Sequence, residues 1–414
     1  MRTPKAAVAA LFSHPVIAGL ALTLCAAALL AVLTPPITFN GGLGNDGKRY
    51  ADLTEGLRGN PAELPWGPLA FRVLPSALVA WLPFDIPTGF LIVNVLSVLG
   101  ASILLLRLLG RFGTPPPIAL LALVWWLSLP MGLRWAIYYP VLGDAFGFLV
   151  LVALILCALE RRLVLFAVTL AAGVLARENL VMTIPFLWRA HVRSAPVRWT
   201  VLVALASVPA IAAFLLIRAF PPVAPAAGSD ALTQATVVAQ ELVLIFENQS
   251  GQAWRVLLAA PLSLGLLLVI PLLRARATLR FLSREMHWMY FAALAVVLAV
   301  IGGRDNDRYF YALAPLLLIL TFAVHGDLWS SWPRAAALTT LQLIALRVGW
   351  PIGTTEYEYL QYTTGFMELD RLFALALLMA LVSVVAIVLV RSRRGAGEAL
   401  EVTPGSLHVR TNAH

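Results

Sequence analysis

The stretch from Gly41 to Tyr50, GGLGNDGKRY, places one carboxylate and two cations among four glycines. The stretch approximates a phosphate-binding loop, since Gly42 is followed by four residues and then by Gly47-Lys48. That motif continues with a Ser or Thr, whose hydroxyl binds magnesium. Arg49 occupies this position and has no hydroxyl. The glycines instead predict a tight turn that positions Asp46. We expect Asp46 to act as a general base, with an Asx-turn role as the alternative.

Further ionisable and aromatic residues lie at the edges of apolar segments, where charge is costly and is often paired or functional. They are Arg72, Arg134, Tyr138, Tyr139, Asp144, Arg177, Glu178, the run Arg304-Asp305-Asn306-Asp307-Arg308, and the acids Glu356, Glu358, Glu368 and Asp370. Structural roles compete with functional ones. The run 304–308 can close a turn through an ion pair, Asp144 can begin a helix, and residues 356–370 can form a solvated loop.

The composition assigns the chain to the membrane class. Of its 414 residues, 60% are hydrophobic and 12% are charged, whereas soluble domains contain about half and a quarter respectively. The net charge of +9 comes from basic clusters between apolar segments, which is typical of a membrane topology signal rather than of nucleic-acid binding. Cys25 and Cys157 lie in apolar runs, so a disulfide framework is not expected.

The apolar segments predict an all-α polytopic protein of about twelve transmembrane helices, since a span needs roughly 20 apolar residues. The predicted spans are Pro15–Leu33, Thr88–Leu106, Pro115–Met131, Val141–Leu159, Leu163–Ala176, Leu180–Trp188, Trp199–Ile217, Ala253–Leu273, Met286–Ile301, Tyr309–Val324, Ala335–Leu346 and Leu372–Val390. The segment Leu69–Leu82, between two prolines, is too short to cross and predicts an interfacial helix in the first outer loop. The fifth and sixth spans are short, and we expect two helices that meet near the outer face at Arg177.

Charge sets the orientation of these spans. With both termini in the cytoplasm, most basic residues fall in cytoplasmic loops and most acidic residues fall outside, as the positive-inside rule requires. Residues 1–392 then form one membrane domain with an outer loop at 34–87, and residues 393–414 form a cytoplasmic tail that we expect to be disordered. Asp46 lies on the outer face, which cytosolic nucleotides do not reach.

This layout resembles the GT-C superfamily of membrane glycosyltransferases. The likeness rests on Asp46-Gly47 with Tyr50 after a first span, on the Leu69–Leu82 helix, and on the turn Gly173 to Asn179. The resemblance implies transfer of a hexose or pentose from a polyprenyl-phosphate donor to a lipid, glycan or protein acceptor. It also implies an extracytoplasmic site in a plasma membrane, with a function in the cell envelope. Asp46 is the one catalytic position that the resemblance carries over. The tight acid pair of some members is lacking, because the next acid is Asp52, and so is a large soluble C-terminal domain.

Such a transfer needs a base for the acceptor hydroxyl and cations for the departing phosphate. A carboxylate at an apolar boundary can act as the base, and the guanidinium fork of arginine suits phosphate. We therefore predict Asp46 as the base. The residues predicted to bind the donor or its phosphate are Arg177, Arg304, Arg308, Arg72, Asp144, Glu178, Tyr50 and Tyr139.

No cofactor is required for this chemistry, although Asp46 and Asp144 could hold a divalent cation. All six histidines fall in predicted cytoplasmic segments or tails, so a histidine zinc site on the outer face is not expected. The alternative function is a transporter or flippase of a lipid-linked or small polar substrate. A noncatalytic assembly subunit is a third reading, and it leaves Asp46 and the arginines without a role.

Overall fold

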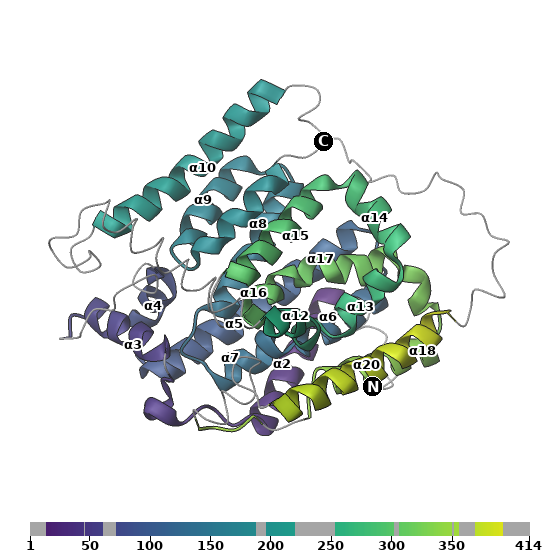
Figure 1. Cartoon of the computed structure of the whole chain (residues 1–414). Coiled ribbons are helices and arrows are strands. Elements are labelled where there is room, and N and C mark those ends of the chain that lie inside the picture. The colour runs from purple at the N-terminus through teal and green to yellow at the C-terminus, as the bar shows by residue number, and fades with distance from the viewer. Residues whose placement is uncertain are drawn as a thin grey trace, which may run out of the picture.

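A computed structural model describes residues 14–44, 46–60, 72–187, 196–219, 253–301, 306–349, 352–355 and 369–391 (Figure 1). These residues form helices and connecting turns, and no strand occurs among them. The first half contains α2 (Pro15–Leu33), η1 (Phe39–Gly42), α3 (Asp46–Leu57), α4 (Val73–Ala80), α5 (Ile86–Arg111), α6 (Pro116–Leu127), η3 (Pro130–Arg134), α7 (Trp135–Tyr138), α8 (Asp144–Leu159), α9 (Leu163–Val174), η4 (Glu178–Leu187) and α10 (Pro196–Ala219).

The second half is built from shorter and more interrupted helices. They are α12 (Ala253–Leu264), α13 (Leu266–Leu273), α14 (Ala275–Arg284), α15 (Met286–Ile301), α16 (Asn306–Phe310), η6 (Tyr311–Leu313), α17 (Ala314–Leu318), η7 (Ile319–Val324), η8 (Gly326–Ser330), α18 (Trp332–Ala345) and α20 (Leu369–Arg391). Many of the breaks coincide with proline or glycine, which remove a hydrogen-bond donor or permit conformations that other residues avoid.

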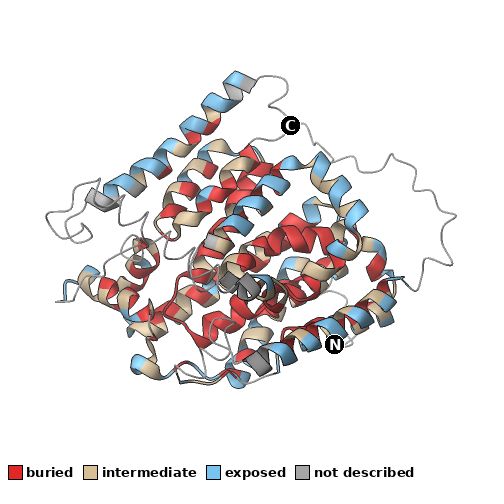
Figure 2. Ribbon diagram, viewed as in Figure 1, coloured by how far each residue is buried: buried red, intermediate tan, exposed pale blue. Residues whose placement is uncertain are grey.

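Several helices are long and apolar enough to cross a membrane. By length and composition these are Pro15–Leu33, Ile86–Arg111 and Phe373–Arg391, with a fourth if the pair Pro116–Leu127 and Pro130–Tyr138, bent by 53°, forms one span. Their outer faces expose apolar side chains (Figure 2). Val32 in α2 is 82% exposed and Phe373 in α20 is 72% exposed. Because water disfavours such surfaces, these helices indicate a membrane protein.

The first and last predicted spans agree closely with the structure. Pro15–Leu33 has the bounds of α2, and Leu372–Val390 lies within α20. The predicted span Thr88–Leu106 is extended to Ile86–Arg111, because the Asp85 carboxylate accepts a hydrogen bond from the Thr88 amide at 3.1 Å and caps the helix. The segment Leu69–Leu82 is helical over α4, Val73–Ala80. Residues 61–71 before α4 lie outside the described residues, as does the tail 393–414.

Two other predicted spans contain a break in the helix that the sequence did not predict. The segment predicted as Pro115–Met131 is helical only to Leu127, and the chain bends at Pro130 into the π-helical η3. The segment predicted as Ala253–Leu273 is divided into α12 and α13 at Gly265. Proline has no amide hydrogen, and Gly265 has a left-handed φ, so neither continues a regular helix.

The predicted break at Arg177 is confirmed. Helix α9 ends at Val174, and the chain turns through Arg177, whose amide donates to the Gly173 carbonyl at 2.7 Å. The following segment, η4, is a 3₁₀ helix containing Pro185 rather than the expected α-helix. Arg177 therefore lies at a turn between two helical segments and not in the middle of one long helix.

Gly265 shows how a broken helix is kept stable. Its φ of +56° and ψ of −134° belong to a region that only glycine occupies readily. Gln342 of α18 spans the break, since its Oε1 accepts from the Leu266 amide at 2.6 Å and its Nε2 donates to the Leu264 carbonyl at 3.2 Å. One buried side chain thus satisfies backbone groups that the interruption leaves without helical partners.

Gly265→Ala is expected to destabilise the protein by about 1–3 kcal/mol from backbone strain alone. The added Cβ would also lie 2.5 Å from Oε1 of Gln342. The measurement is thermal unfolding in detergent micelles. Gly110→Ala in α5 is the matched control, because its Cβ would meet nothing within 4 Å and alanine favours helices. A loss of stability in Gly110→Ala as large as that in Gly265→Ala would contradict this explanation.

Candidate functional site

The glycine-rich stretch forms a turn that delivers Asp46 to the first position of α3. Gly41, Gly42 and Gly44 have φ values of +65°, +85° and +61°, which glycine adopts without steric cost. A Cβ on Gly44 would lie 2.3 Å from the Tyr139 hydroxyl, so the turn lies directly against this ring. The Tyr139 hydroxyl accepts a hydrogen bond from the Gly47 amide at 2.9 Å. The predicted tight turn at Asp46 is therefore present, and Tyr139 fixes its position.

An ion-pair network centres on Asp144. One carboxylate oxygen of Asp144 accepts from Arg177 Nη1 at 2.6 Å, and the other accepts from Arg308 Nη2 at 2.8 Å. Arg308 Nη1 also reaches the Asp46 carboxylate at 3.5 Å. These ion pairs join four segments that are far apart in the sequence. They are the start of α3, the start of α8, the turn after α9 and the short helix α16.

Asp144 lies at a helix start, which is the structural role that its position in the sequence allows. Gly143 precedes it, and α8 begins at Asp144 itself. A carboxylate in the first turn interacts favourably with the exposed backbone amides of the helix. The buried Asp144 carboxylate combines this local role with its contacts to Arg177 and Arg308.

A second ion pair lies beside the first. Arg72 donates two hydrogen bonds to the Glu178 carboxylate, from Nε at 3.0 Å and from Nη2 at 2.6 Å. Arg72 also lies beside the buried hydroxyl of Tyr50. Burial raises the pKa of Tyr50 and of Tyr139, so both hydroxyls remain neutral and available for hydrogen bonding.

Asp46 is the accessible carboxylate of the Asp144 network. Its side chain is 39% exposed, whereas those of Asp144 and Arg308 are each 10% exposed and that of Arg177 is 13% exposed. Its contact with Arg308 is also longer than the two contacts of Asp144. Asp46 is thus the carboxylate that can approach an incoming polar group.

Most of the predicted site residues come together. Asp46, Asp144, Arg177 and Arg308 share one network, and Arg72, Glu178, Tyr50 and Tyr139 adjoin it. Arg304 and the acids at 356–368 lie outside the described residues. Arg134 is a structural residue instead, because its buried guanidinium donates to Thr34 Oγ1 at 3.3 Å and to the Arg347 carbonyl at 2.8 Å.

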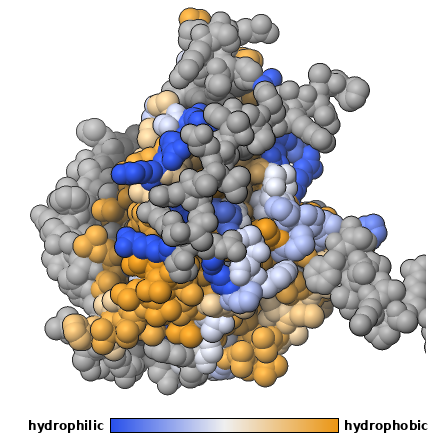
Figure 3. Space-filling view, turned by 90° about the vertical axis from the view of Figure 1, so that its right-hand side faces the viewer, coloured by the Kyte–Doolittle hydropathy of each residue, from blue (hydrophilic) through white to orange (hydrophobic). Residues whose placement is uncertain are grey.

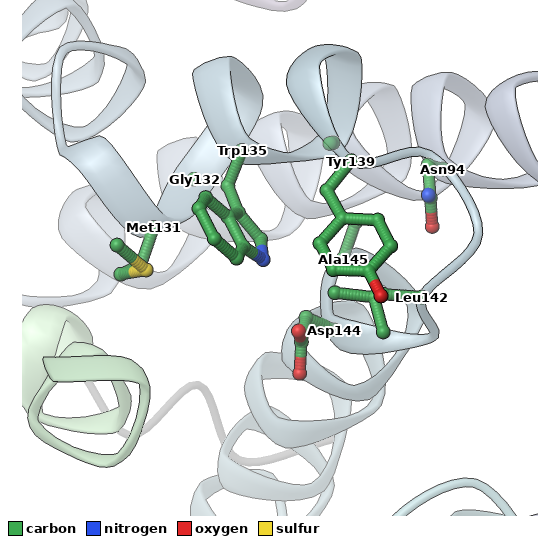
Figure 4. Close-up of a pocket in the computed structure, with 9 residues that line it drawn as sticks. Asn94, Met131, Gly132, Trp135, Tyr139, Leu142, Asp144 and Ala145 are labelled. Carbon is green, nitrogen blue, oxygen red and sulfur yellow. The ribbon is translucent and has the colours of Figure 1, made fainter. Parts of the chain in front are cut away.

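A small pocket adjoins Asp144 and adds residues that the sequence did not single out (Figure 4). It holds about 170 Å³ of empty space, and its lining includes Asn94, Met131, Trp135, Tyr139 and Asp144. Asn94 Nδ2 donates to the Pro140 carbonyl at 2.7 Å, while its buried Oδ1 has no hydrogen-bond partner. The sequence offered one signal for Asn94, which is a single amide side chain inside an apolar span. Burying such a polar group at membrane depth is costly, and these groups are often functional.

The positions of Asp46 and Asp144 bear on the predicted divalent cation. The Arg308 guanidinium lies between the two carboxylates and contacts both. Within the described ranges no cluster of three or more His, Cys, Asp or Glu side chains is arranged to hold a metal ion. The positive charge between these carboxylates is therefore supplied by an arginine.

Comparison with protein-family profiles, with curated proteins and with solved structures finds no match to this chain.

Asp144→Asn is expected to destabilise the protein by about 3–5 kcal/mol, because it leaves the buried Arg177 and Arg308 without their shared counter-charge. Asp46→Asn removes a partly exposed partner and should cost at most about 1 kcal/mol. Thermal unfolding of both variants in the same detergent measures the difference. Equal shifts for the two variants would show that Asp144 does not organise the network.

Proposed function

We propose that this chain is a polytopic membrane glycosyltransferase that uses a polyprenyl-phosphate sugar on the extracytoplasmic face. The observation that carries the proposal is the pairing of an accessible carboxylate, Asp46, with Arg308, which Asp144 holds together with Arg177. A base and two adjacent cations are the groups that this reaction requires. The layout of the chain also resembles the GT-C superfamily.

In the proposed reaction, Asp46 takes the proton of the acceptor hydroxyl as that oxygen forms a bond to the sugar carbon. The bond between this carbon and the donor phosphate oxygen breaks, and the phosphate leaves with the electron pair. Arg308 and Arg177 stabilise the negative charge on the phosphate. Asp144 is a positioning residue, because its two carboxylate oxygens orient both guanidinium groups.

The pocket beside Asp144 supplies groups that suit the transferred sugar. Trp135 and Tyr139 offer aromatic faces, and Asn94 Oδ1 can accept a hydrogen bond from a sugar hydroxyl. In this structure the pocket is too narrow to admit a water-sized group. We therefore propose that the pocket widens on binding, with the flexible Met131 side chain moving aside.

The proposed topology has about twelve spans, both termini in the cytoplasm, and α4 lying in the outer interface. The parallel pair α5 and α8 supports this orientation (Figure 1). Asn94 and Asp144 lie towards the site end of these helices, while Arg107 and Arg111 pair with Glu160 at the other end. Arg107 and Arg111 thus lie at the end of the helix pair opposite the site, as the positive-inside rule predicts.

Reporter fusions test this orientation. A reporter at residue 60 is expected outside and one at residue 400 inside, because residue 60 lies in the predicted outer loop 34–87 and residue 400 follows the basic end of α20. Each position is fused to alkaline phosphatase and, separately, to a fluorescent protein, each of which is active on one side of the membrane. The active reporter then identifies the compartment of that residue. The same compartment for both positions would refute the topology.

Asp46→Asn should reduce sugar transfer by about 10²–10⁴-fold, the usual contribution of a positioned general base. Asparagine retains the size of the side chain and its ability to form an Asx turn. The assay is transfer from a polyprenyl-phosphate sugar by the purified protein in lipid, with donor binding measured in parallel. Donor binding is expected to persist.

Glu55→Gln is the matched control, since Glu55 is another carboxylate on α3 and pairs with Arg58 rather than with the site. Its transfer rate should stay within about twofold of the wild type. Near-normal turnover by Asp46→Asn would end the assignment of Asp46 as the base.

A transporter or flippase is the second candidate, and the interrupted helices favour it. The bent pair Pro116–Leu127 and Pro130–Tyr138 ends beside the site, and discontinuous helices commonly form substrate sites in transporters. Movement of a lipid-linked sugar across proteoliposomes without transfer to any acceptor would support this candidate instead.

A further inference from the structure

A second charged surface lies at the end of the molecule opposite the candidate site. Glu160, just after α8, receives Arg107 at 2.6 Å, Arg162 at 3.1 Å and Arg111 at 3.7 Å. Helix α8 separates this cluster from Asp144 by about 24 Å at 1.5 Å per residue. With three cations around one anion, the cluster carries an excess positive charge. Arg107 and Arg162 are more than half exposed.

Helix α14 extends this positive charge. Arg276, Arg280 and Arg284 recur every four residues and are exposed, so they form one row along the helix surface. Like charges at this spacing repel one another. Among the residues that the structure describes, no carboxylate forms an ion pair with any of the three. The row is therefore left for an external anion.

Tertiary contacts join the two groups of arginines. Phe281, about a quarter of a turn round α14 from the centre of the row, contacts Phe112 just after α5, with ring centroids 6.0 Å apart. Phe112 also contacts Trp288 of α15 at 6.3 Å. We call the resulting surface the arginine face, which consists of Arg107, Arg111, Arg162, Arg276, Arg280 and Arg284.

Apolar side chains lie next to the arginine row. Leu279 is 63% exposed on α14, and Leu272 at the end of α13 is 66% exposed. Figure 3 shows the side of the molecule on which α14 and α18 lie, where groups of hydrophilic side chains border a wide hydrophobic surface. A helix with arginines beside exposed leucines fits the boundary between headgroups and acyl chains. A purely aqueous polyanion such as nucleic acid gives these leucines no partner.

We propose that the arginine face binds the headgroups of anionic phospholipids in the leaflet opposite the candidate site. The α14 arginines contact lipid phosphates while Leu279 and Leu272 enter the acyl region. The cluster around Glu160 extends the positive surface across the adjoining helix ends. This binding does not depend on the proposed sugar transfer.

The test compares lipid-dependent stability of the wild type with that of R276Q/R280Q/R284Q. Phosphatidylglycerol is added to the full-length protein in neutral detergent, with phosphatidylcholine as the neutral lipid. We expect phosphatidylglycerol to raise the Tm of the wild type more than phosphatidylcholine does. The triple variant should lose at least half of this difference, and added salt should reduce it in the wild type.

A charge-matched control removes three arginines that are exposed or partly exposed outside α14, in R161Q/R334Q/R391Q. This control should keep most of the phosphatidylglycerol effect. An unchanged effect in the α14 variant, or an equal loss in the control, would overturn the proposal. If the α14 triple variant does not fold, the three single variants are measured, and three unchanged effects would overturn the proposal as well.

Discussion

The buried carboxylate of Asp144 is the interaction on which the arrangement of the site depends. A charge removed from water is stable only when it is paired and hydrogen-bonded, and Asp144 meets this requirement by binding Arg177 and Arg308. Each partner comes from a different segment, so the helices that carry them must end at the same place. The turn after α9, the short helix α16 and the start of α8 are therefore held in one fixed relation. Asp46 joins them from the least buried position of the network.

The same physical requirement governs the interrupted helices. In an apolar environment each backbone amide and carbonyl freed by a break needs another partner, and the few polar side chains supply many of them. Gln342 spans the break at Gly265. Arg134 donates to the Arg347 carbonyl, and the Tyr138 hydroxyl donates to the Gly353 carbonyl. In a chain with only 12% charged residues, these polar side chains act at helix ends and breaks.

The two ends of the α5 and α8 pair differ in charge balance. At the site end, Arg72, Arg177 and Arg308 are matched in number by Asp46, Asp144 and Glu178. At the other end, arginines exceed the nearby carboxylates. A balanced cluster suits a reaction in which charge moves, whereas an excess of cations suits attachment to a fixed anionic surface. One helix pair separates these two environments.

The sequence by itself determined the helical membrane class, the first and last spans, the break at Arg177 and the glycine turn at Asp46. Hydropathy, proline and glycine act over short distances, so these features can be read locally. Only the tertiary structure decided that Arg308, 262 residues from Asp46, is its partner, that Asp144 begins its helix, and that Asn94 lines a pocket. It also revealed the bend after Leu127 and the break at Gly265, which Gln342 stabilises from another helix. These outcomes depend on which distant groups satisfy a buried charge or amide, and local patterns do not specify that choice.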